Sequence, residues 1–261
     1  MRYAPILAAL TMLSALPASA LPAVADLPPG LVSARLLPGW VAEGGDRVSA
    51  LELVLQPGWK TYWRSPGDSG LPPEFDWRGS NIGAVRFHWP APEVIVSDGE
   101  RTLGYHERLI LPFTVAPSDP SLPVGISAGV SFGLCENICI PASLDLIAPA
   151  AAASPDPVIE DAMALAPRLS EALPACEISE IEDGMSLTLI APETGADIAV
   201  EYEGGRDIWV SSPEIDSGRG ELRVDLVAPS GRPFPVDPGA VVITLIEASG
   251  ATEFRGCATA G

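Results

Sequence analysis

The chain is poor in positive charge. It carries 15 Lys and Arg residues against 34 Asp and Glu residues, which gives a formal net charge of -19 over 261 residues. Such a chain offers no positive field to displace counterions from nucleic acid or to attract anionic lipid headgroups. The composition therefore excludes nucleic-acid binding and binding to an anionic membrane surface.

Long apolar runs are missing after the N-terminus. The first 25 residues combine Arg2, an apolar stretch at residues 6–16 and small-residue sites ending at Ala20 and Ala25, which is typical of a secretory signal. We expect it to be removed after Ala25. No later stretch reaches the roughly 18 apolar residues that span a bilayer, so we expect export without stable membrane insertion.

Cysteine is scarce, and its four copies fall into two pairs. A bond between Cys176 and Cys257 would close a loop of about 82 residues and add roughly 4 to 5 kcal/mol on the chain-entropy model. The loop between Cys135 and Cys139 is so short that its closure would add only about 2 kcal/mol. The spacing predicts a structural disulfide for the distant pair and a chemical role for the local pair.

Helical periodicity is rare in this chain. Short alternating runs separated by Gly and Pro predict an all-β protein with antiparallel sandwiches. We expect a first β domain at residues 26–148, a linker with one short helix at 149–174, and a second β-sandwich domain at 175–261. Asp156 and Pro157 would begin the helix, and Pro167 would kink or split it.

Three chemical roles are open to Cys135 and Cys139 from spacing alone: disulfide exchange, metal binding and an inert staple. We expect Pro141 to favour a fixed turn at the pair, because it cannot continue a hydrogen-bonded strand or helix. Copper or zinc binding needs further ligands. The two histidines of the chain, His88 and His106, both precede the pair.

Four segments in order carry a family resemblance: QPGWKTYWRSPGDSGLPP (56–73), WPAP (89–92), LGYHERLILP (103–112) and CENICIP (135–141). Together they resemble the periplasmic N-terminal domain of the thiol:disulfide interchange protein DsbD, and most closely its ScsB-like branch. In that branch the two cysteines also enclose three residues. The resemblance covers residues 28–147.

This resemblance implies that the first domain is an immunoglobulin-like sandwich. We expect the second strand-rich region to form another such domain, so that the whole fold has two immunoglobulin-like sandwich domains. It implies that Cys139 is the attacking thiol and that Cys135 resolves the mixed disulfide. Tyr62 corresponds to an aromatic residue beside the family's active site, and Trp59 lies close to it in the sequence. The family's cap loop, which shields the cysteines, corresponds to residues 97–105.

The cap loop of this chain lacks the phenylalanine that covers the disulfide in the better-known member of the family. Leu103 or Tyr105 would have to provide the apolar cover instead. Asp98 and Glu100 lie in the same loop, where a carboxylate would raise the pKa of a nearby thiol.

The resemblance further implies a periplasmic location and thioredoxin-fold partners, with no small cofactor and no metal, since the cysteine pair is itself the redox centre. Related proteins usually continue into a membrane electron-conducting domain. Because this sequence ends at Gly261 without one, we expect a protein-disulfide reductase component that receives electrons from a separate membrane donor. The alternatives are a non-catalytic periplasmic binding module and a copper-handling chaperone that uses the same thiols.

Overall fold

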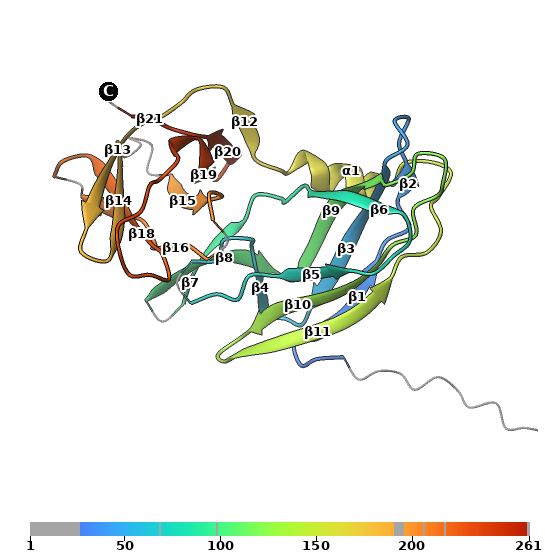
Figure 1. The fold of residues 1–261 in the computed structure, drawn as a ribbon. Coiled ribbons are helices and arrows are strands. Elements are labelled where there is room, and N and C mark those ends of the chain that lie inside the picture. The colour runs from blue at the N-terminus through green and yellow to red at the C-terminus, as the bar shows by residue number, and fades with distance from the viewer. Residues whose placement is uncertain are drawn as a thin grey trace, which may run out of the picture.

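The computed structural model describes residues 27–259 apart from residues 68, 98, 191–195, 206 and 217. The predicted signal segment lies outside this range. Strands dominate the described residues and form two pairs of packed sheets, one after the other along the chain (Figure 1). The predicted all-β class with immunoglobulin-like sandwiches is confirmed. No helix among the described residues is long and apolar enough to cross a membrane.

The first pair of sheets encloses a core that both sheets supply in alternation. Leu51 and Leu53 of one sheet and Val130 and Leu134 of the other are almost inaccessible, as expected when every second side chain points inward. One sheet contains β1 (Leu31–Leu36), β2 (Trp40–Val41), β3 (Arg47–Leu55), β6 (Ile82–Phe87) and β9 (Arg108–Pro117). The other contains β4 (Lys60–Tyr62), β5 (Glu74–Trp77), β7 (Glu93–Ser97), β8 (Glu100–His106), β10 (Ser127–Cys135) and β11 (Cys139–Ile147).

The second pair of sheets has its own apolar core, which includes Leu187, Leu222 and Val224. A disulfide joins Cys176 in β13 to Cys257, just before β21. One sheet contains β12 (Arg168–Ser170), β15 (Asp197–Tyr202), β19 (Val241–Glu247) and β20 (Gly250–Arg255). The other contains β13 (Ala175–Ile181), β14 (Gly184–Ile190), β16 (Trp209–Val210), β17 (Glu214–Asp216), β18 (Glu221–Val227) and β21 (Ala258–Thr259), and the short 3-10 helix η1 (Pro238–Ala240) precedes β19.

A short helix, α1 (Pro157–Ala164), connects the two pairs of sheets. The Asp156 carboxylate caps it by accepting a hydrogen bond from the Val158 amide at 3.0 Å, and Ile159 is fully buried against the first sheet pair. The helix ends before Pro167, whose ring excludes a helical conformation in the residue before it. The chain then forms β12, which pairs in parallel with β20, so the helix is neither kinked nor continued.

Glu52 is a charged residue with only 4% of its side chain exposed. It accepts hydrogen bonds from Arg35 and, at 3.1 Å, from the Nε of Arg108, on the two strands that flank β3. Burial alone would raise the pKa of the Glu52 carboxyl, but the hydrogen bonds and positive charges of the two arginines outweigh it and lower that pKa below its ordinary value.

Glu52→Gln is expected to lower the free energy of unfolding at pH 7 by about 1 to 3 kcal/mol, because two charge-assisted hydrogen bonds are weakened. A lowered carboxyl pKa contributes stability above the unfolded pKa, and this is lost as pH falls through the folded pKa. The difference between wild type and variant in urea unfolding should therefore shrink between pH 5 and pH 3. The exposed Glu74→Gln is the control, with an expected change within about 0.5 kcal/mol.

Candidate redox site

Cys135 and Cys139 close the hairpin formed by β10 and β11. Cys135 is the last residue of β10, Cys139 is the first of β11, and the two are direct partners in the ladder and are joined by a disulfide. Pro141 lies inside β11, opposite Gly133, and the turn lies before it, between Cys135 and Cys139. The prediction that Pro141 ends the strand and fixes the turn is therefore wrong. A proline is tolerated there because β11 is an edge strand that needs no donor on its outer side.

The two sulfur-bearing residues differ in burial. Cys135 is 1% exposed, and β4 pairs with β10 on its other side, with Lys60 opposite Cys135. Cys139 is exposed, and the neighbouring Ile138 at the hairpin tip is 76% exposed. Of the two cysteines, Cys139 is therefore the one that is exposed to an approaching partner.

Tyr62 touches both sulfurs. Its hydroxyl oxygen lies 2.7 Å from the Sγ of Cys135 and 3.1 Å from the Sγ of Cys139. Because a disulfide has no hydrogen to donate, the phenol is the donor in both contacts. Burial raises the pKa of the Tyr62 phenol, and the negative charge of Glu100 raises it further, so the hydroxyl keeps its proton at neutral pH.

We call residues 64–67 and 69–71 the covering segment, because its Gly70 lies close to the Tyr62 ring and its Leu71 approaches Gly133 together with that ring. Two glycines make this possible. A Cβ on Gly133 would lie 2.9 Å from both the Leu71 Cβ and the Tyr62 ring, and one on Gly70 would lie 2.2 Å from Pro66 and 2.9 Å from the same ring. The ring is therefore held between two backbones that approach closely, and Tyr62 is only 1% exposed.

Leu103 and Tyr105 do not provide the predicted apolar cover of the disulfide. Tyr62 pairs with Gly104, so the alternation of side chains in β8 directs Leu103 and Tyr105 to the opposite face. Both are buried in the core of the first sheet pair, and the Tyr105 hydroxyl donates a hydrogen bond to the Pro90 carbonyl at 2.8 Å.

The other predicted residues near the site occupy different places. Glu100 is exposed and acts on Tyr62 through its charge. Asp98 lies outside the described residues. Trp59 is partly buried and packs so closely on Gly30 that a Cβ there would lie 2.0 Å from its ring.

Lys60 and His106 continue the row of directly paired residues that begins with Cys139 and Cys135 and crosses the sheet. Neither was predicted as part of the site. Lys60 pairs with both Cys135 and His106, and its ammonium donates to the Thr102 hydroxyl at 3.3 Å, although Lys60 is only 8% exposed. The spacing of Lys60 and Tyr62 in β4 is the signal that could have found it, because residues two apart share one face.

Each histidine has a hydrogen-bonding partner. His106 contacts the Glu93 carboxylate at 2.9 Å, and His88 contacts the Thr114 hydroxyl at 2.7 Å. Among the described residues, no group of three or more histidine, cysteine, aspartate and glutamate side chains is arranged to hold a metal ion.

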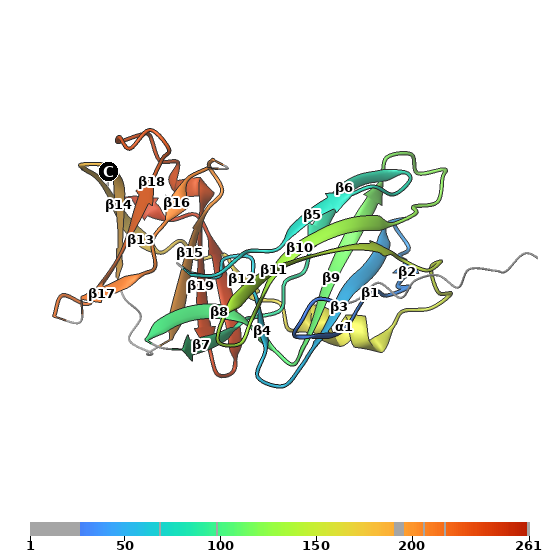
Figure 2. The same ribbon diagram turned by 90° about the horizontal axis from the view of Figure 1, so that it is seen from below.

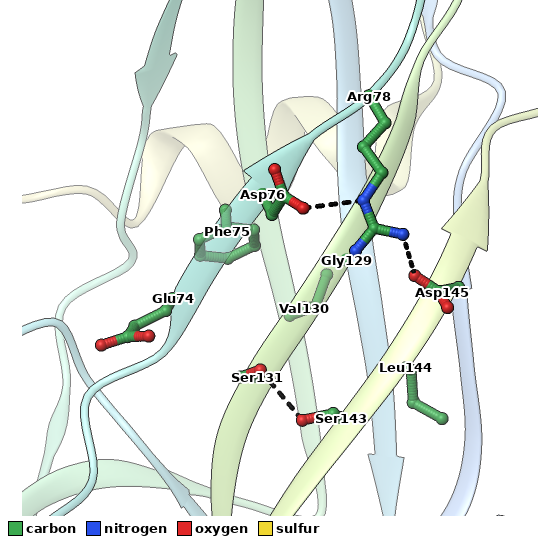
Figure 3. Close-up of a pocket in the computed structure, with 10 residues that line it drawn as sticks. All are labelled: Glu74, Phe75, Asp76, Arg78, Gly129, Val130, Ser131, Ser143, Leu144 and Asp145. Carbon is green, nitrogen blue, oxygen red and sulfur yellow. Dashed lines mark hydrogen bonds and ion pairs between the residues drawn. The ribbon is translucent and has the colours of Figure 1, made fainter.

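A cavity of about 410 Å³ lies beside β5, β10 and β11 and contains neither cysteine (Figure 3). Its polar side chains are paired with one another: Arg78 bridges Asp76 and Asp145, each at 2.7 Å, and Ser131 contacts Ser143 at 2.9 Å. The disulfide lies instead at the turn end of the β10–β11 hairpin, beside the exposed Ile138.

The fold and the site define an all-β protein with a disulfide whose two cysteine residues are unequally exposed. Residues 33–151 match the family model described as "Thiol:disulfide interchange protein DsbD, N-terminal". This segment is therefore similar to the N-terminal domain of DsbD, and the predicted resemblance is confirmed.

A solved structure is also similar, namely the N-terminal periplasmic domain of ScsB from Proteus mirabilis. The TM-score is 0.60 at 22% sequence identity, and the match covers 87% of this chain and 92% of the ScsB chain. At this identity the likeness concerns the fold. No curated protein matches the sequence.

Replacing Tyr62 by phenylalanine is expected to slow disulfide exchange by about tenfold or more, since a hydrogen bond to a departing thiolate contributes about 1.5 to 3 kcal/mol. The rate of reduction by dithiothreitol, followed by quenching with a thiol-reactive mass tag, measures this. The control is Tyr105→Phe, which removes a buried hydroxyl on the opposite face. An equal loss in both variants would contradict the assignment.

The Tyr62 hydroxyl also predicts a pH dependence of stability. The pKa of the phenol is raised in the folded protein above its ordinary value of 10.0. Its contribution is therefore complete below pH 10 and is lost as pH rises through the folded pKa. The stability difference between wild type and Tyr62→Phe in urea unfolding should be constant from pH 7 to pH 9 and change in favour of the variant above pH 10.

Proposed function

We propose that this protein is a periplasmic thiol:disulfide interchange protein that passes reducing equivalents to thioredoxin-fold partners through Cys135 and Cys139. The observation that carries the proposal is the asymmetry of the pair: an exposed Cys139 is bonded to a buried Cys135, and one phenol contacts both sulfurs. An inert staple would need neither the exposure nor the donor.

The exchange would proceed in two displacements. In the reduced protein the Cys139 thiolate attacks one sulfur of a partner disulfide, and the other partner sulfur leaves with the electron pair as a thiolate. The Cys135 thiolate then attacks the Sγ of Cys139, so that the internal disulfide forms and the partner's remaining sulfur leaves as a thiolate. Two electrons pass to the partner, whose thiolates take up protons.

Tyr62 has a defined part in these steps. Its hydroxyl lies within reach of both sulfurs, so it can donate a hydrogen bond to whichever carries negative charge. The interior position of Cys135 makes such a donor necessary, because a buried thiolate without a donor is costly.

The wider setting belongs to the same proposal. The signal segment would direct the chain to the periplasm, and residues 26–148 and 175–261 would be separate domains joined by the linker and helix. The redox centre needs no small cofactor. Electrons would reach Cys135 and Cys139 from a separate membrane donor.

A transfer experiment tests the proposal. The protein is reduced, freed of small thiols and mixed with an oxidised thioredoxin-fold protein, and the thiols on both are counted by mass after alkylation. The expected result is the gain of two thiols by the partner for each Cys135–Cys139 disulfide formed. Retention of both thiols by the reduced protein, with a range of thioredoxin-fold acceptors, would contradict the proposal.

A further inference from the structure

Arg64 links the redox site to the second pair of sheets. Its Nε and Nη2 atoms bind the Glu201 carboxylate of β15 at 2.9 to 3.1 Å, and Nη2 also binds Glu253 of β20 at 2.6 Å. The side chains of Arg64, Glu201 and Glu253 are only 23%, 19% and 10% exposed. A paired, fork-shaped contact of this kind is strong and fixes orientation as well as distance. We call these three residues the clamp.

The clamp holds the beginning of the covering segment. Arg64 is its first residue, and its guanidinium lies 4.4 Å from the centre of the adjacent Trp63 ring, which is fully buried. The Pro66 carbonyl accepts a hydrogen bond from the Leu103 amide at 3.0 Å. A Cβ on Gly67 would lie 3.0 Å from the Arg101 carbonyl, so the segment is fitted closely onto β8.

Arg101 forms a further ion pair between the first and the second pair of sheets, at the same end of the first pair. Arg101 of β8 binds Asp197 of β15 at 2.8 Å and the Ile198 carbonyl at 3.3 Å. In both views β4 and β8 lie on the side of the first sheet pair that faces β15 and β19 (Figure 1, Figure 2). The junction therefore lies on the side of the sheet where the covering segment starts.

A continuous series of contacts runs from this junction to the sulfurs. The clamp holds Arg64, Gly70 later in the segment lies close to both Pro66 and the Tyr62 ring, and the Tyr62 hydroxyl contacts the sulfurs of Cys135 and Cys139. The covering segment has no strand or helix of its own, so its position depends on what holds its ends.

We propose that the second pair of sheets positions the redox site, and that Arg64 is the positioning residue: its ion pairs with Glu201 and Glu253 keep the covering segment on Tyr62, which keeps Cys135 out of solvent and confines attack to Cys139. The inference rests on the proposed exchange function and gives the second pair of sheets a part in it. Loosening the clamp would leave the cysteines in place but make the inner thiol accessible.

Alkylation of each cysteine in the reduced full chain tests this. Wild type, the double variant Glu201→Gln with Glu253→Gln, and Arg64→Gln are treated with iodoacetamide, and labelling of Cys135 and Cys139 is followed separately by peptide mass spectrometry. Arg78→Gln is the matched control, because it also removes an arginine with two carboxylate partners from the first sheet pair but does not touch the covering segment. Circular dichroism and urea unfolding confirm that each variant is folded.

In the clamp variants the alkylation rate of Cys135 should rise by about tenfold or more relative to wild type. The alkylation rate of Cys139 should change by less than about twofold. Arg78→Gln should behave as wild type. Folded clamp variants with a wild-type Cys135 rate would overturn the proposal, and so would equal acceleration at both cysteines, which indicates general loosening. Should the double variant not fold, Glu201→Gln alone gives the same comparison. The assay contains no partner, so its result is separate from whether wild type transfers electrons.

Discussion

Cys139→Ser is expected to reduce electron transfer to a thioredoxin-fold acceptor by more than about a thousandfold, since a serine hydroxyl does not replace a thiolate as the nucleophile. Cys135→Ser should behave differently. It keeps the exposed thiol and can attack, but it cannot release the partner, so it should stop after one mixed disulfide per molecule.

The comparison needs rates and products from the same samples. Single-turnover mixing with acid quenching gives the rate, and non-reducing gels give the adduct. The double variant Cys135→Ser with Cys139→Ser is the control for labelling at other sites. Equal adduct formation by both single variants would contradict the unequal roles that their burial suggests.

Cys176→Ala with Cys257→Ala is expected to cause the largest loss of stability, about 4 to 5 kcal/mol, because the disulfide closes a loop of some 82 residues in the unfolded chain. Both cysteines are also 6% exposed, so the substitutions disturb a packed core as well. Removing Cys135 and Cys139 in the same way should reduce stability by no more than about 2 kcal/mol.

Urea unfolding of the two double variants, monitored by fluorescence and circular dichroism, measures this difference. The Cys176 and Cys257 variant should lose the structure of the second sheet pair first, whereas the first sheet pair should remain folded. A larger loss from the local pair than from the distant pair would contradict this division of tasks.

Local pattern was sufficient to predict the strand-rich fold. Alternating runs such as residues 47–55 become β3, with inward side chains packed in one core. The proximity of Tyr62 to the cysteines followed from the family motif rather than from the pattern, since Tyr62 and Cys135 are 73 positions apart in sequence.

Side-chain parity explains the error at Leu103 and Tyr105. A shift of one residue in the pairing register of a strand moves every side chain to the other face of the sheet. The sequence of β8 does not indicate which residue pairs with Tyr62. Gly104 takes that place, so its neighbours enter the core. The register of Lys60 with Cys135 is hidden for the same reason.

The covering segment and its clamp carry no local signal. Gly70 and Gly133 matter because two distant backbones approach one tyrosine ring, and Arg64 meets carboxylates 137 and 189 positions away. Such contacts follow from how the sheets pack, which a single sequence does not encode in any short window.

The most direct measurement identifies the peptide that is covalently joined to an oxidised thioredoxin-fold acceptor. The adduct formed by Cys135→Ser is digested without reduction and analysed by mass spectrometry. The account predicts a linked peptide that contains Cys139 and one acceptor cysteine. A linked peptide containing Cys176 or Cys257, or no adduct while the acceptor is still reduced by wild type, would contradict it.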